Sequence, residues 1–209
     1  MNYKNEFSEE LLREWRDAVY NSANGYHKQV EDFKQAHKEE YKIITSMYRK
    51  RVALRDCTDI MTALNEPIYW FTLTFNNDKD INKISTKRRE AEMFLNKMSA
   101  CYVLVEEFGE DNGRYHIHGF VVFKYGYGFL DFKEWHSRQK LEEMNGYKLK
   151  TKIKYLTKYA VKQVPRIRRS KTMSLLCKFY NTHKRFKRCF PEHYEDKFNK
   201  FVATTINPF

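Results

Sequence analysis

The stretch Cys101–Phe123, "CYVLVEEFGEDNGRYHIHGFVVF", holds two runs of β-branched and aromatic residues on either side of the polar sequence "GEDNGR". Such a pattern is typical of two antiparallel strands joined by a turn. A third run of this kind, Ile68–Phe75, reads "IYWFTLTF" and predicts a buried strand, and a helix is expected after it over Thr86–Met98. The sequence therefore predicts an α+β fold in which a central antiparallel sheet is flanked by helices.

The segments on either side of these strands favour helices. The residues from 8 to 64 are highly charged and helix-forming, begin with a serine followed by two glutamates as a capped start, and are closed off by Pro67. Helices are also expected over Lys133–Met144 and Lys154–Gln163. We therefore expect three parts: an N-terminal helical extension over 1–66, a core over 67–165, and a basic helical C-terminal segment over 166–209 packed on that core.

The composition favours a nucleic-acid partner. The chain carries 39 Lys and Arg against 27 Asp and Glu, a net charge of +12, together with 16 Phe and 15 Tyr. Cations meet phosphates and aromatic rings stack on unpaired bases, so this mixture suits single-stranded nucleic acid, although ribosomal, chromatin and membrane-surface proteins share such a charge. Four dispersed cysteines and no continuous apolar run predict free thiols, no signal peptide and no membrane partner, so we expect an intracellular protein.

The histidines in "RYHIHGF" form a candidate metal site. His116 and His118 are separated by one residue, so both imidazoles project from the same face of the predicted strand. Histidines are common metal ligands, and a third ligand is expected from the neighbouring strand. If the hairpin turns at "DN", Glu107 lies opposite His116, whereas a turn one residue longer places Glu106 opposite His118. We prefer Glu107; the alternative is a pair of histidines that binds no metal.

The segment Lys154–Gln163, "KYLTKYAVKQ", places Tyr155, Tyr159 and Lys162 on one face of a helix, with Lys158 beside them. Apolar residues gather on the other face, so packing does not require the tyrosines. A phenol has a pKa of about 10 and becomes a nucleophile at neutral pH only when cations stabilise the phenolate or a base takes its proton. The segment is therefore a nucleophile-bearing helix or, alternatively, an amphipathic helix with half-buried tyrosines beside lysines.

In chain order, "WFTLTF", "HIH" and "YLTK" resemble the three motifs of the HUH endonucleases, the rolling-circle replication initiators of small single-stranded DNA viruses, phages and plasmids. Two tyrosines four residues apart further resemble the gene A initiators of isometric microvirus phages. The resemblance covers Ile68 to Val164. It implies a ferredoxin-like HUH nuclease fold for 67–165, with a divalent metal ion, Mg²⁺ or Mn²⁺, held by His116, His118 and Glu107.

The resemblance also implies a reaction. Tyr155, in the family's tyrosine-lysine position, would cleave single-stranded DNA at an origin and keep the 5′-phosphate, leaving a 3′-OH for a polymerase. Tyr159 would cleave the regenerated junction, while Lys158 and Lys162 stabilise the phenolates or hold the flanking phosphates. The implied partners are a stem-loop origin, a host polymerase and, because the chain shows no helicase motif, a host helicase, in the cytoplasm of a bacterial host.

Further DNA contacts are expected outside these motifs. A basic segment after the tyrosine helix is expected to follow the DNA backbone, unless it is a solvated charge run: Arg166, Arg168, Arg169 and Lys171. Unpaired bases are expected to stack on three aromatic residues: Tyr125, Tyr127 and Phe129. The rival functions are a single-strand transposase or relaxase of the same chemistry, a non-catalytic origin-binding module, and an RNA-binding protein with a similar sheet.

Overall fold

The computed structural model describes residues 8–23, 28–75, 81–108, 114–135, 139–162 and 167–206, and the chain divides into two compact units, Met1–Arg51 and Val52–Phe209. None of the helices in these ranges is both long and apolar enough to cross a membrane.

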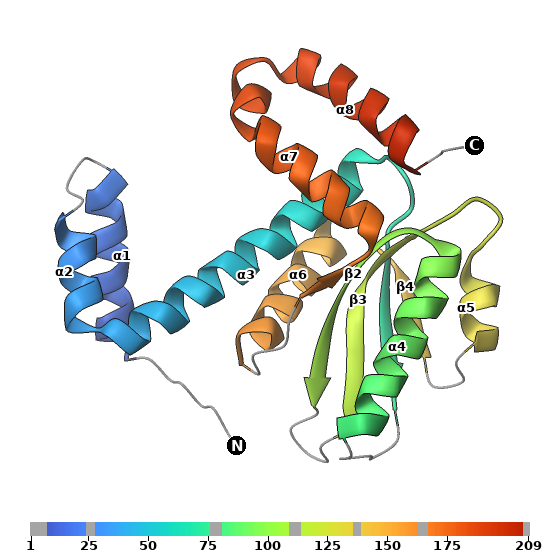
Figure 1. The fold of residues 1–209 in the computed structure, drawn as a ribbon, viewed down its shortest axis with the longest axis horizontal. Coiled ribbons are helices and arrows are strands. Elements are labelled where there is room, and N and C mark those ends of the chain that lie inside the picture. The colour runs from blue at the N-terminus through green and yellow to red at the C-terminus, as the bar shows by residue number, and fades with distance from the viewer. Residues whose placement is uncertain are drawn as a thin grey trace. The chain divides into compact units, whose positions relative to one another are not determined.

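The first unit is helical, as the sequence predicts. It contains α1 (Glu9–Ala23), α2 (Lys28–Ala36) and the first half of α3 (Lys38–Ala63), shown in blue in Figure 1. The hydroxyl of Ser8 accepts a hydrogen bond from the Leu11 N–H at 3.1 Å, so the expected cap is present. Ala18, Phe33 and Ile44 form a small buried core, against which Trp15 packs.

The second unit is built on a five-stranded antiparallel sheet with the order β4-β1-β3-β2-β5 (Figure 1). The strands are β1 (Tyr69–Thr74), β2 (Ser99–Phe108), β3 (Tyr115–Phe123), β4 (Gln139–Glu143) and β5 (Arg168–Arg169). Helix α4 (Ile81–Met98) connects β1 to β2, and α5 (Phe129–Trp135) lies between β3 and β4. This β-α-β-β-α-β order is the ferredoxin-like arrangement, so the predicted α+β fold is confirmed.

Alternation along the strands sends side chains into two separate cores. Phe71 and Leu104 point to one face, where Leu95 of α4 and Phe132 of α5 cover them. The other face carries Trp70, and it is covered by the second half of α3 and by α6 (Gly146–Lys162), α7 (Lys171–Cys189) and α8 (Pro191–Ile206). The sheet is therefore buried on both faces, and the histidine pair lies on the α6 face.

The expected helix over Lys133–Met144 is wrong. Helix α5 ends at Trp135, and Gln139–Glu143 pairs with β1 as an edge strand. Polar, charged residues with helical propensity form this strand because the unpaired edge of β1 offers backbone hydrogen bonds that outweigh a weak local preference. The tyrosine helix in turn begins earlier than expected, since the Asn145 side chain accepts a hydrogen bond from the Lys148 N–H at 3.0 Å and caps α6. Helix α4 likewise begins before the expected start, at Ile81.

Candidate active site

The β2–β3 hairpin has the register that the preferred turn predicts. Glu107 pairs with His116 and Val105 pairs with His118. Because residues directly opposite each other in an antiparallel pair share a face, both imidazoles and the Glu107 carboxylate lie on the side of the sheet that α6 covers.

Glu106 points to the other face and already has partners there. Its carboxylate accepts hydrogen bonds from the Tyr115 hydroxyl at 3.0 Å and from Arg168 Nε at 2.9 Å, and Arg88 lies 3.6 Å away. The alternation of the strand therefore separates the two neighbouring glutamates, and only Glu107 is placed to act together with the histidines.

Two threonines of β1 orient the imidazoles. His118 Nδ1 lies 3.0 Å from the Thr72 hydroxyl, and His116 Nδ1 lies 3.1 Å from the Thr74 hydroxyl. When Nδ1 carries the proton and donates it to the threonine, each ring keeps the lone pair of Nε2. A hydrogen bond to the remote ring nitrogen is the usual arrangement around metal-binding histidines.

The Glu107 carboxylate provides the test of whether the residues fit a metal ion. Its Oε2 is buried 2.8 Å from His118 Nε2, yet it accepts no hydrogen bond of good geometry from any residue that the structure describes. Two ligand atoms about 2.1 Å from an octahedral ion lie about 3 Å apart, close to this spacing. No three His, Cys, Asp or Glu side chains of the described ranges form a ready-made metal cluster, so His118 and Glu107 make the close pair and His116 lies next to them.

Electrostatics favours the neutral, ligand-competent form of His116. Burial lowers its pKa below the ordinary value of 6.5, and the neighbouring His118 adds to that effect. The two rings are stacked with centroids 5.7 Å apart.

Helix α6 brings Tyr155 to the histidines. The Tyr155 ring makes edge contacts with His118, at a centroid distance of 5.6 Å, and with Trp70 at 5.8 Å, and it is 38% exposed. The side chains around it enclose a cavity of about 310 Å³, lined by Trp70, Thr72, Thr74, Glu107, His116, His118, Lys140, Lys152 and Tyr155. A phenol, two imidazoles and a carboxylate thus face one open space, a set that suits phosphoryl transfer to tyrosine.

Three other residues predicted for this helix, Lys158, Tyr159 and Lys162, lie on α6, and their side chains fall outside the described part of the chain. Among the residues predicted to bind DNA, Arg166 lies outside the described ranges. Arg168 pairs with Glu106 at 2.9 Å and with Glu92 at 3.5 Å. Arg169 hydrogen-bonds the Cys177 thiol, and Lys171 is exposed at the beginning of α7.

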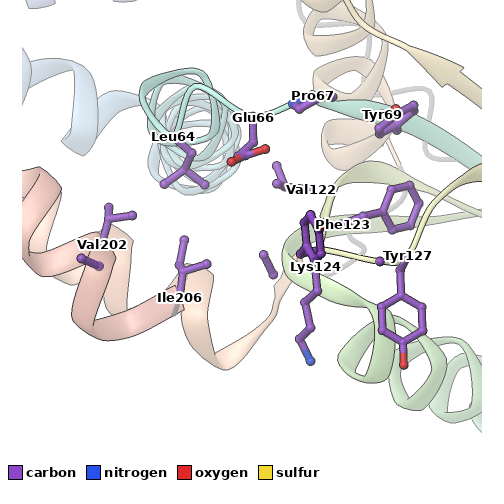
Figure 2. A pocket seen from close by; sticks show the side chains of 14 residues that line it. Leu64, Glu66, Pro67, Tyr69, Val122, Phe123, Lys124, Tyr127, Val202 and Ile206 are labelled. Atoms are coloured by element: carbon purple, nitrogen blue, oxygen red, sulfur yellow. The ribbon is translucent and has the colours of Figure 1, made fainter. Parts of the chain in front are cut away.

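The tyrosines predicted to stack on bases line a different cavity. Tyr125 and Tyr127 border a space of about 650 Å³ at the end of the sheet away from His116, together with apolar residues of α3 and α8 such as Leu64 and Ile206 (Figure 2). Tyr125 is fully exposed, and the side chain of Phe129 is outside the described set. These rings therefore do not belong to the cavity around Tyr155.

Sequence reasoning missed several residues of the site. The alternation in "WFTLTF" puts Trp70, Thr72 and Thr74 on one face, so that signal was available in the sequence. Lys140 was not accessible to such reasoning because its strand reads as a helix, and Lys152 lies ahead of the helix start that was expected.

Comparison with known proteins gives one match. Residues 68–164 match a family model of replication-associated proteins, the ORF2 type. No curated protein was found to match the chain. The matched region runs from β1 to α6 and includes His116, His118, Glu107 and Tyr155. The match, over the region that carries the cavity, supports a replication protein of the Rep type.

Proposed function

We propose that this protein is a replication initiator that nicks and rejoins single-stranded DNA by attack of a tyrosine on a phosphodiester. The observation that supports this most directly is the shared cavity of Tyr155, His116, His118 and Glu107 within the region that matches replication-associated proteins.

Each residue has a separate role in the proposed reaction. The Tyr155 oxygen, after loss of its proton, attacks the scissile phosphorus, and the bond from phosphorus to the 3′-oxygen breaks. The 5′-phosphate stays on the tyrosine, and the departing 3′-oxygen takes up a proton and becomes a 3′-OH. His116, His118 and Glu107 would hold a divalent cation, Mg²⁺ or Mn²⁺, whose Lewis acidity polarises the scissile phosphate.

The second tyrosine completes the cycle in this proposal. After synthesis from the 3′-OH by a host polymerase and strand separation by a host helicase, Tyr159 cleaves the regenerated origin. The released 3′-OH attacks the phosphotyrosine of Tyr155 and closes a circle. Lys158 and Lys162 stabilise the phenolates, and Arg166 and Lys171 contact the backbone near a stem-loop origin.

The proposal is tested by trapping the covalent intermediate. The protein is incubated with a pool of 5′- and 3′-labelled stem-loop oligonucleotides in Mn²⁺, Mg²⁺ or EDTA, and adducts are resolved on denaturing gels and mapped by mass spectrometry. We expect a metal-dependent adduct on the 3′ fragment, reduced in Tyr155→Phe or Tyr159→Phe and absent from the double variant.

The matched control is Tyr147→Phe, because Tyr147 lies on the same helix, is 82% exposed and does not line the cavity. It should form the adduct at the wild-type rate. If DNA binds tightly but no oligonucleotide yields an adduct in either metal, the nuclease is rejected in favour of a non-catalytic origin-binding protein.

A further inference from the structure

Two lysines line the cavity of Tyr155 without belonging to any of the predicted motifs. Lys140 lies on β4 directly opposite Thr72, so its side chain shares the face of the sheet that carries the histidines. Lys152 lies three residues before Tyr155 on α6, about 60° around the helix, and therefore on the same side. An edge strand and a helix, distinct in the sequence, thus bring two ammonium groups to one open space.

The position of Lys152 is fixed by its contacts. Its Nζ lies 4.9 Å from the centroid of the Trp70 ring and 3.6 Å from a carboxylate oxygen of Glu142, and its side chain is 25% exposed. The Trp70 ring in turn stacks on His118, with centroids 5.6 Å apart, and touches Tyr155. The ammonium group is therefore held in a defined place relative to both the nucleophile and the imidazoles.

The ion pair around Glu142 permits Lys152 to change partner. The other oxygen of Glu142 lies 3.2 Å from Lys148, an exposed lysine that does not line the cavity. If a phosphate takes Lys152, Glu142 keeps Lys148, and no buried carboxylate is left unpaired. Such an exchange avoids the main cost of breaking a salt bridge.

The charge of the cavity favours an anion. Glu107 is the one carboxylate among the described residues that line it, against the two ammonium groups of Lys140 and Lys152. If Glu107 contributes to binding a divalent cation, the remaining charge is strongly positive. A phosphodiester carries one negative charge and accepts hydrogen bonds from several directions, which ammonium groups provide.

We propose that Lys140 and Lys152 form a phosphate clamp, which binds a backbone phosphate of single-stranded DNA and positions the strand for attack by Tyr155. The inference rests on the proposed function and deepens it, because it assigns two positioning residues and the part of the substrate that they hold. The clamp reads no base, so it contributes affinity without sequence preference.

The test measures binding separately from cleavage. The full chain is titrated with fluorescein-labelled oligo(dT) in EDTA over a series of NaCl concentrations, and affinity is followed by fluorescence anisotropy. Each of Lys140→Gln and Lys152→Gln should weaken binding and flatten the plot of log K against log salt by about 0.7, the value for one phosphate contact on a single strand. Lys152→Arg keeps the charge and should restore the slope.

Lys148→Gln is the matched control, since it removes a lysine bound to the same Glu142 carboxylate outside the cavity. It should leave the slope unchanged, and thermal unfolding checks that every variant is folded. Wild-type slopes for both Lys140→Gln and Lys152→Gln, or an equal loss in Lys148→Gln, would overturn the clamp.

The adduct assay separates this outcome from failure of the nuclease. A tyrosine adduct together with unchanged slopes rejects the clamp and leaves the nuclease standing. Flattened slopes without an adduct on any oligonucleotide support the phosphate site and reject the nuclease.

Discussion

Each imidazole of the site uses Nδ1 for a threonine hydroxyl, and this contact decides how the ring presents Nε2. In Thr72→Val the shape of the side chain is kept and the partner of His118 is lost. Because such contacts fix ring orientation and tautomer, we expect affinity for Mn²⁺ to fall by about 10- to 100-fold. Calorimetric titration of the folded variant measures this, with thermal unfolding as the control for stability. Unchanged affinity would show that Thr72 does not orient a metal ligand.

A second residue-scale feature is the thiol pair of Cys57 and Cys177, whose sulfur atoms lie 3.6 Å apart. The hydrogen bond with Cys57 and the nearby Arg169 guanidinium lower the pKa of Cys177 to about 7, despite its burial. Burial raises the pKa of Cys101 to about 12, so that thiol does not titrate in the same range.

Removing the guanidinium should therefore raise the pKa of Cys177, because the thiolate loses a stabilising positive charge. We expect the ultraviolet absorbance of the thiolate to titrate near pH 7 in a Cys189→Ser background and at higher pH after the further change Arg169→Met. Identical titration curves for the two proteins would contradict the role assigned to Arg169.

At the scale of elements, strand β3 depends on a glycine. Gly119 pairs with Phe71 of β1 and Leu104 of β2, and a Cβ built there would collide with the Val103 carbonyl oxygen and lie 2.8 Å from the Phe71 ring. Gly119→Ala should therefore lower the free energy of unfolding by about 1–3 kcal/mol or more, because the strands on both sides must move.

Urea unfolding measures this change against Gly128→Ala, where a Cβ meets no described atom within 4 Å. The control should unfold close to the wild type. Equal stability of the two variants would mean that the sheet accommodates a side chain at 119.

Strand β4 shows the limit of prediction at this scale. Its sequence, "QKLEE", has no β-branched or aromatic residue, and it forms a strand because it completes the edge of β1. In contrast, β1, β2 and β3 are rich in such residues and were predictable from sequence. The error on β4 also hid Lys140, so a fold-level miss became a miss in the site.

At the scale of the whole molecule, each compact unit has a core of its own. The sheet and both of its buried clusters lie within Val52–Phe209, and the cluster around Phe33 lies within Met1–Arg51. We therefore expect a truncated chain that begins at Val52 to unfold in one cooperative transition and to keep the metal-dependent adduct. Calorimetry and the adduct assay test this. A truncated chain that is unfolded would show that the second unit requires the first.

The sequence by itself determined the strands β1 to β3, the helical N-terminal region, and the shared face of His116, His118 and Glu107, because these follow from the two-residue period of a strand and from a short turn. Only the tertiary structure decided that Tyr155 meets His118, that Glu106 is engaged by Arg168, and that Lys140 joins Lys152 at the same cavity. These contacts join segments far apart in the chain. They depend on which edges and faces remain to be covered once the local elements have formed, and no local pattern encodes that outcome.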